Sequence, residues 1–191
     1  MKIFESTCNT RFLLENSTRY IRSDVPTSVS PREREWLLQN GVTTVLDLRT
    51  EEERNHRHCP LMEDSRFLYE TFPVAGGGAV PRSVDEVARS YIAMVDTAFE
   101  CMIAGMLKSP SGILYFCSAG KDRTGVVSAV LLKELGMPTS YIVADYMKSA
   151  HNLAPWLAAY ARQDPTLDLA VITPQPRYIE ALLRWYTEGR R

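Results

Sequence analysis

The chain has 191 residues, enough for one domain with a sizeable core, and its composition is ordinary for a globular protein. Its 22 basic and 23 acidic residues leave a formal net charge of −1, which gives no general support for nucleic-acid binding or membrane-surface attraction. No apolar run reaches the roughly 18 residues of a membrane span, and the start has no apolar core like that of a signal peptide. We therefore expect a single cytoplasmic domain over residues 1–191, with no integral membrane segment.

The first third of the chain predicts two strands with a helix between them. The segments RYIRS (19–23) and VTTVLDL (42–48) are strand-like. Ser30 and Glu33 form a capping box with proline at the first helical position, so a helix should begin there and end near Gly41.

Two further capping signals predict helix starts. Thr50 with Glu53 begins a second helix, and Ser83 with Glu86 begins a third. Between them the segment RFLYETF (66–72) is a strand candidate.

The third helix is expected to be the longest, because its apolar residues keep helical spacing over residues 84–106. Its methionine-rich stripe is interpreted as core, in preference to a cofactor site. The stretch AGGGAVP (75–81), just before it, is the one flexible-looking segment. The continuous apolar run GILYFC (112–117) is typical of a strand that is covered on both faces.

Helical patterns follow at residues 124–135, 138–149, 155–161 and 175–188. Strands that alternate with helices favour an α/β fold with a central, mostly parallel sheet flanked by helices. The surplus of helices predicts a helix-rich C-terminal part.

The cysteines are scattered at positions 8, 59, 101 and 117, and no two form a CxxC pair. Neither a zinc site nor a thioredoxin-type motif is therefore predicted. His56 and His58, next to Cys59, are interpreted as part of a solvated loop. We expect Cys8, Cys59 and Cys101 to be ordinary thiols.

Chemistry is concentrated in the segment CSAGKDRTG (117–125), which joins the end of the apolar strand to the start of a helix. Ligands of open α/β sheets bind at the carboxyl ends of strands, and a helix N-terminus offers unpaired N–H groups. Small residues and a glycine allow the backbone to curl into a nest for phosphate. The predicted binding residues are Ser118, Ala119, Gly120, Lys121, Thr124 and Gly125.

Cys117 is the predicted nucleophile, because a helix N-terminus and nearby cations favour the thiolate form of a cysteine. Arg123, six residues later, is expected to bind two phosphate oxygens in a bidentate fork. Thr124 is expected to donate its hydroxyl to the sulfur. Such a loop stabilises a transferring phosphoryl group without a metal or other cofactor.

This loop resembles that of the cysteine-dependent protein tyrosine and dual-specificity phosphatases, and looks most like atypical bacterial tyrosine phosphatases with Lys-Asp before the arginine. YIRSD (20–24), NGVTTVLDLRTEEE (40–53) and VADYMKS (143–149) are similar to other segments of that family. The resemblance implies a phosphomonoester hydrolase that forms a cysteinyl-phosphate intermediate, with a phosphorylated protein or phosphoinositide as substrate.

The sequence departs from the family at two points. Phe116 stands where the family usually has histidine before the nucleophile. The region that matches the mobile loop with the general acid, residues 71–81, has no aspartate or glutamate. Asp85 is predicted to be the second residue of a helix, where it interacts with the helix dipole. Asp122 is therefore the preferred acid, as the similar loop of myotubularin-like lipid phosphatases implies; the alternative is a loop-stabilising acceptor.

Several alternatives stay open at this point. Lys121 either meets a second phosphate, which would favour a phosphoinositide or inositol-phosphate phosphatase, or is solvated or pairs with a nearby carboxylate. Phe116 and the missing acid would also fit a phosphate-binding pseudophosphatase; a sulfur-transfer or arsenate-reducing enzyme agrees less well with the motif. Arg49 is expected to form a salt bridge to the acidic helix start TEEE (50–53), in preference to orienting the loop or the substrate.

Overall fold

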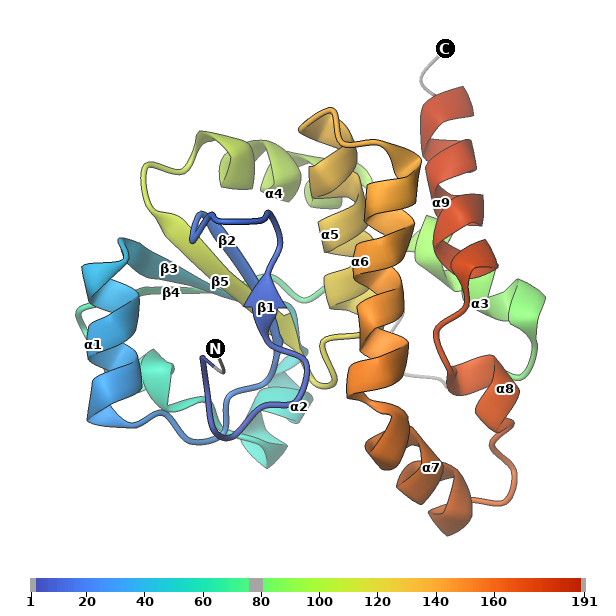
Figure 1. Ribbon diagram of the computed structural model, residues 1–191, viewed down its shortest axis with the longest axis horizontal. Helices are drawn as coiled ribbons and strands as arrows, with labels where there is room; N and C mark the ends of the chain where they lie inside the picture. Colours follow the sequence, from blue (N-terminus) through green and yellow to red (C-terminus); the bar gives the residue numbers. More distant parts are fainter. Residues whose placement is uncertain (1–2, 76–80, 190–191) are drawn as a thin grey trace. The chain divides into compact units, whose positions relative to one another are not determined.

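The computed structural model describes residues 3–75 and 81–189, so most of the flexible-looking stretch 75–81 lies outside the described residues (Figure 1). The chain divides into two compact units. Met1–Val74 with Ala104–Gly120 forms the first, and Ala75–Ile103 with Lys121–Arg191 forms the second.

The first unit is built on a mostly parallel sheet, which within the described residues has five strands in the order β1-β2-β5-β3-β4. Of these five described strands, only β1 runs antiparallel to its neighbour. The strands are β1 (Arg11–Phe12), β2 (Tyr20–Asp24), β3 (Val42–Asp47), β4 (Leu68–Thr71) and β5 (Gly112–Cys117). The predicted α/β fold and the four predicted strands are confirmed, whereas the two-residue β1 is too short to give a sequence pattern.

β5 lies at the centre of this sheet, between β2 and β3. Its residues 113–117 are all buried, as expected for a strand covered on both faces. The register pairs Cys117 with Asp24 of β2 and Phe116 with Asp47 of β3. The carboxyl ends of the three strands therefore meet at one edge of the sheet, which is where ligands bind in this class of fold.

Two helices of the first unit begin where the sequence predicts. In α1 (Pro31–Gln39) Ser30 accepts from the N–H of Glu33, whose carboxylate accepts from the N–H of Ser30. Thr50 and Glu53 form the same reciprocal pair at the start of α2 (Glu51–His56). The short 3₁₀ helix η1 (Pro60–Glu63) follows.

Among its described residues the second unit contains helices and no strand. Its helices are α3 (Val84–Ala93), α5 (Asp122–Glu134), α6 (Thr139–Asn152), α7 (Ala154–Gln163), α8 (Leu169–Ile172) and α9 (Pro176–Glu188). α5, α6 and α9 lie side by side and α3 packs on α9 (Figure 1). Residues 123–132 of α5 are all buried, so this helix is the core of the unit. The four helices predicted for the C-terminal part are confirmed, and the short α8 was not predicted.

The single long helix predicted for residues 84–106 is wrong. The chain instead forms α3 and then α4 (Thr97–Lys108), which begins in the second unit and ends in the first. Asp96 causes the restart, because its carboxylate accepts from the N–H of Phe99 at 2.8 Å, as an N-cap side chain does. The apolar spacing continues across this break and therefore does not reveal it.

Within the described ranges, no single helix has both the length and the apolar character needed to cross a membrane. The bent pair α3 and α4 meets that criterion only when its two helices are counted together.

We expect Asp96→Ala to lower the free energy of unfolding by about 1 kcal/mol, because the substitution removes the N-cap of α4. Asp96→Asn, which keeps the accepting oxygen, should stay close to wild type. Urea denaturation monitored by circular dichroism measures both.

The matched control is Asp85→Ala. Asp85 is the second residue of α3, is exposed, and makes no side-chain hydrogen bond to a residue that the structure describes, so its loss should cost only about 0.3 kcal/mol through the helix dipole. Equal losses for Asp85→Ala and Asp96→Ala would show that Asp96 contributes charge and no cap.

Candidate active site

The predicted loop runs from Cys117, the last residue of β5, to Gly125 in the first turns of α5. Cys117, Ser118, Ala119 and Gly120 belong to the first unit, and the residues from Lys121 onward to the second. The two parts are continuous in the chain, and each has its own set of contacts within its unit.

The nucleophile candidate lies at a rigid position. Cys117 is buried, with 3% of its surface exposed, at the end of the central strand. The preceding residue, Phe116, belongs to the hydrophobic core, and its ring lies 5.4 Å from the guanidinium of Arg49. Phe116 therefore gives the strand end an apolar anchor and a cation–π contact, where a histidine would offer a hydrogen bond.

The carbonyl groups of the turn after Cys117 are held by two buried side chains. The amide nitrogen of Asn9 donates to the carbonyl oxygens of Ala119 (3.2 Å) and Gly120 (2.9 Å). The guanidinium of Arg22, on β2, also donates to the oxygen of Gly120, at 2.9 Å. Because the N–H of a trans peptide points opposite to its C=O, the N–H groups of these peptides are directed to the other side, as a phosphate nest requires.

Asp24 in turn holds Asn9 in place. Its carboxylate accepts from the backbone N–H groups of Cys8 (3.0 Å) and Asn9 (2.8 Å). Burial raises the pKa of Asp24 above its ordinary value, and the hydrogen bonds from Cys8 and Asn9 partly offset that effect. Sequence reasoning missed Asn9, Arg22 and Asp24 as site residues; only the YIRSD motif, which contains two of them, pointed to this region.

Gly120 is the residue that makes the turn possible. Its φ is +65°, in the left-handed region. A Cβ at this position would lie 2.5 Å from both the amide nitrogen of Asp24 and the carbonyl oxygen of Ser23. Both the conformation and the close approach of two backbones therefore require glycine.

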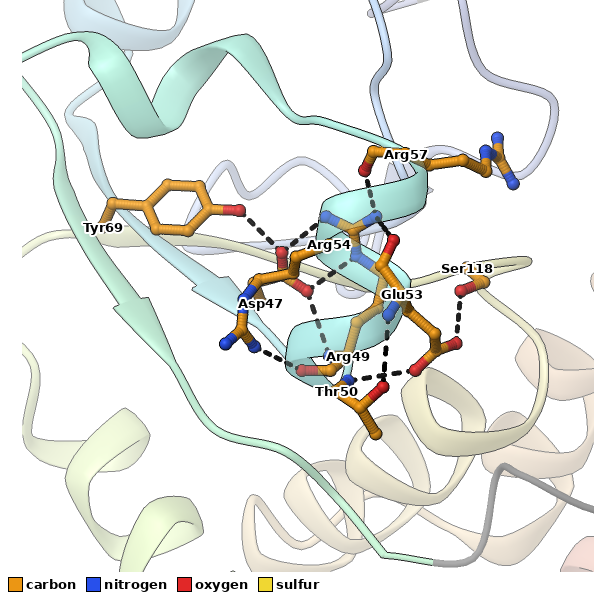
Figure 2. A network of polar contacts seen from close by, with 8 residues as sticks. All are labelled: Asp47, Arg49, Thr50, Glu53, Arg54, Arg57, Tyr69 and Ser118. Atoms are coloured by element: carbon orange, nitrogen blue, oxygen red, sulfur yellow. Dashed lines mark hydrogen bonds and ion pairs between the residues drawn. The ribbon is translucent and has the colours of Figure 1, made fainter.

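A polar network at the start of α2 reaches the same turn (Figure 2). The carboxylate of Glu53 uses one oxygen to cap α2, and its other oxygen accepts from the hydroxyl of Ser118 at 2.6 Å. Ser118 follows Cys117 directly, so the capping residue of α2 also fixes the residue after the nucleophile candidate.

The predicted salt bridge between Arg49 and the acidic helix start TEEE (50–53) is wrong. Arg49 forms a buried, bidentate pair with the side chain of Asp47, at 2.9 and 2.7 Å, and donates to the backbone carbonyl oxygen of Glu53 at 3.5 Å. The hydroxyl of Tyr69 donates to the same carboxylate at 2.6 Å (Figure 2). Residues i and i+2 of an extended chain point to the same side, which favours Asp47 as the partner and was available from the sequence.

The remaining cysteines carry no sign of reactivity. Burial raises the pKa of Cys59 to about 11, so its thiol stays protonated at neutral pH. Cys8 and Cys101 are exposed and, like Cys59, form no disulfide. Over the part of the chain that the structure describes, no cluster of His, Cys, Asp and Glu is able to hold a metal.

In the second unit, Lys121 and Asp122 are engaged with their surroundings. The ammonium of Lys121 donates to the carbonyl oxygen of Ile172 at 2.6 Å and lies 3.4 Å from one carboxylate oxygen of Asp122. The other oxygen of Asp122 accepts from the hydroxyl of Tyr91 at 2.5 Å. Pairing with a carboxylate was one of the two alternatives for Lys121, and the structure contains that contact.

The next two residues start the buried core of α5. Arg123 is buried, with 5% of its surface exposed, and Thr124 is completely buried. The hydroxyl of Thr124 makes no hydrogen bond to any residue that the structure describes. Asp85, the less favoured acid, is the second residue of α3, as predicted.

An α/β sheet whose central strand ends in Cys-x5-Arg and continues into a buried helix defines the class of cysteine-dependent phosphatase folds. The chain belongs to the tyrosine phosphatase family, whose pattern it matches over residues 16–189.

Relatives with assigned names agree with this family. A tyrosine-protein phosphatase of Nostoc commune is 30% identical over 131 residues, which cover 63% of this chain and 45% of that protein. The triple specificity protein phosphatase of Mycobacterium tuberculosis is 43% identical over 57 residues, 30% of this chain and 20% of that protein. The chain therefore spans less than half the length of either relative.

Among solved structures, the human tyrosine phosphatase-like serine/threonine/tyrosine-interacting protein has a similar fold. The TM-score is 0.50 at 16% sequence identity, over 95% of this chain and 98% of the human one.

We expect Gly120→Ala to lower the free energy of unfolding by at least about 3 kcal/mol and to abolish binding of tungstate, a phosphate-like oxyanion. Both effects follow from the clash of the added methyl group with the backbone of Ser23 and Asp24. Urea denaturation and calorimetric titration measure them.

Gly136→Ala is the matched control, because Gly136 has a φ of +77° but nothing within 4 Å of an added Cβ. It should cost only the left-handed strain, about 1–2 kcal/mol, and leave oxyanion binding intact. If the two variants lost equal stability and both bound tungstate, the close approach at Gly120 would be irrelevant to the loop.

Proposed function

We propose that this chain is a cysteine-dependent phosphatase that hydrolyses phosphotyrosine and related phosphomonoesters of proteins through a cysteinyl-phosphate intermediate. The observation that carries the proposal is the turn after Cys117, in which Asn9 and Arg22 hold the carbonyl oxygens of Ala119 and Gly120. Backbone anchored in this way presents N–H groups to an anion, and the turn leads into the N-terminus of α5.

The first half of the reaction is transfer to sulfur. The thiolate of Cys117 attacks phosphorus, the bond from phosphorus to the ester oxygen breaks, and Asp122 gives a proton to the departing oxygen. Arg123 binds two of the phosphoryl oxygens in its planar fork. The N–H groups of the loop from Ser118 to Gly125 stabilise the charge of the transition state.

The second half regenerates the enzyme. Asp122, now a carboxylate, accepts a proton from water, whose oxygen attacks the phosphorus of the thiophosphate. The bond between phosphorus and sulfur breaks, and inorganic phosphate leaves. The buried hydroxyl of Thr124, which has no other partner in the described structure, supports the assignment that it stabilises the departing thiolate of Cys117. No metal or other cofactor takes part.

The contacts of Lys121 favour a protein substrate. Its ammonium already interacts with the carbonyl oxygen of Ile172 and the carboxylate of Asp122. A second phosphate group, as in a phosphoinositide, would have to compete with both contacts.

The family match over residues 16–189 also supports a single phosphatase domain over the 191 residues of the chain.

We expect wild type to hydrolyse an activated aryl phosphate and phosphotyrosine peptides without added metal, and Cys117→Ser to lose this turnover while it still binds tungstate. Serine keeps the shape of the side chain, but its hydroxyl is a far weaker nucleophile at neutral pH than a thiolate. Steady-state kinetics and calorimetric titration measure the two properties.

Cys101→Ser, at an exposed cysteine, is the control for the substitution itself and should retain wild-type turnover. Appreciable hydrolysis by Cys117→Ser would refute the covalent mechanism. Faster turnover of phosphoinositides than of any phosphopeptide would move the substrate class to lipids and leave the mechanism standing.

We expect Asp122→Asn to reduce kcat/KM by about a hundredfold for phenyl phosphate and by much less for activated aryl phosphates, because asparagine cannot supply a proton. A series of aryl phosphates that differ in leaving-group pKa measures this dependence. A uniform loss over the whole series, together with weaker oxyanion binding, would show that Asp122 only stabilises the loop. Asp85→Asn, at the less favoured acid, is the comparison and should leave the series unchanged.

A further inference from the structure

In the second unit, two buried tyrosines form a chain of hydrogen bonds that ends at Asp122. Tyr91, on α3, donates its hydroxyl to one carboxylate oxygen of Asp122, Oδ1, at 2.5 Å. The hydroxyl of Tyr146, on α6, lies 2.7 Å from that of Tyr91, and the two rings meet edge to face, with centroids 6.1 Å apart. Each tyrosine has 1% of its surface exposed. Side chains of two helices, α3 and α6, thus form a chain of hydrogen bonds to the first residue of α5.

The direction of these hydrogen bonds follows from the count of protons. A phenol carries a single proton, and that of Tyr91 is donated to Asp122, so Tyr146 must donate its own to the oxygen of Tyr91. Burial, and after it the charge of Asp122, raises the pKa of Tyr91 well above its ordinary value. Tyr91 therefore remains a protonated donor throughout the working range of a phosphatase.

This arrangement makes the two oxygens of Asp122 unequal. Oδ1 is engaged by the permanent donor Tyr91. Oδ2 lies 3.4 Å from the ammonium of Lys121. The side chain of Asp122 is 39% exposed. Lys121 is itself held by the carbonyl oxygen of Ile172. Because Oδ1 is committed to Tyr91, Oδ2 is the oxygen of this partly exposed side chain that is left to carry a transferable proton.

We propose that Tyr91 is a positioning residue that fixes Asp122 so that Oδ2, and not Oδ1, delivers the proton to the leaving group. This inference rests on the acid role proposed above for Asp122. The proton leaves Oδ2 as the bond from phosphorus to oxygen breaks, and the resulting carboxylate still accepts from Tyr91 through Oδ1. The proton of Tyr91 does not transfer, so the phenol acts only through the orientation of Asp122.

The test is Tyr91→Phe, measured as kcat/KM over the same series of aryl phosphates. We expect a loss of about tenfold with phenyl phosphate and of less than about twofold with activated esters, since positioning accounts for part of the effect of a general acid. Oxyanion affinity should not change. A merely structural role would lower the whole series by the same factor.

Tyr186→Phe provides a matched control within the same unit. Its buried phenol also donates to a carboxylate of α5, that of Glu134 at 2.9 Å, but at the last residue of the helix, whereas Asp122 is the first. This variant should keep the wild-type dependence on the leaving group.

The double variant Tyr91→Phe, Asp122→Asn separates the possible failures. If Tyr91 acts through Asp122, the double variant loses no more than Asp122→Asn alone. A selective loss in Asp122→Asn but none in Tyr91→Phe would overturn the positioning role and leave the acid in place. A uniform loss in Asp122→Asn would overturn the acid role itself, and with it this inference.

If Tyr91→Phe proves too unstable to assay, Tyr146→Phe tests the same chain of hydrogen bonds one step away. It leaves the bond between Tyr91 and Asp122 in place and removes the donor to Tyr91. We expect a smaller loss with the same dependence on the leaving group, and wild-type values over the whole series would contradict the proposal.

Discussion

The other features of the first unit depend on one constraint, that the backbone carbonyl oxygens in the turn after Cys117 need hydrogen-bond donors. A loop that binds phosphate must point its N–H groups inward, and the carbonyl oxygens of the same peptides then require donors on the other side. Asn9 and Arg22 supply those donors to Ala119 and Gly120, from the N-terminal segment and from β2. Both side chains are completely buried, where an unsatisfied polar group would be costly.

The rest of the unit places these donors where they are needed. The parallel pairing of β2 with β5 brings the end of β2, and with it Arg22 and Asp24, to the end of β5, where Cys117 lies. Asp24 then holds Asn9 through its backbone. Gly120 permits the approach, because any side chain there would collide with the backbone of β2. The sheet register, the carboxylate of Asp24 and the glycine at position 120 therefore all favour the same conformation of the loop.

Features of the fold and the site that depend on residues close together in the sequence were predictable, whereas those that depend on distant residues were not. Buried parallel strands give continuous apolar runs, and capping boxes lie within four residues, so β5 and the starts of α1 and α2 were predictable. The interruption between α3 and α4 depends on the side chain of Asp96, which leaves the apolar spacing unchanged. The loop motif identified Cys117 as the nucleophile candidate. By contrast, Asn9 is more than a hundred residues from the carbonyl groups that it holds, and no periodic pattern joins them.

The carboxylates of the two units differ in how their oxygens are engaged. Asp24 and Glu53 direct their oxygens to backbone N–H groups and, for Glu53, to the hydroxyl of Ser118, so hydrogen bonds from neutral donors stabilise their charge. Asp47 is paired with Arg49. These three carboxylates are buried or committed to structural donors, and none is suited to exchange a proton with a substrate. Asp122 differs in having one oxygen fixed by Tyr91 and a side chain that is partly exposed. Fixed orientation and partial exposure are two properties that support the general-acid role proposed for Asp122.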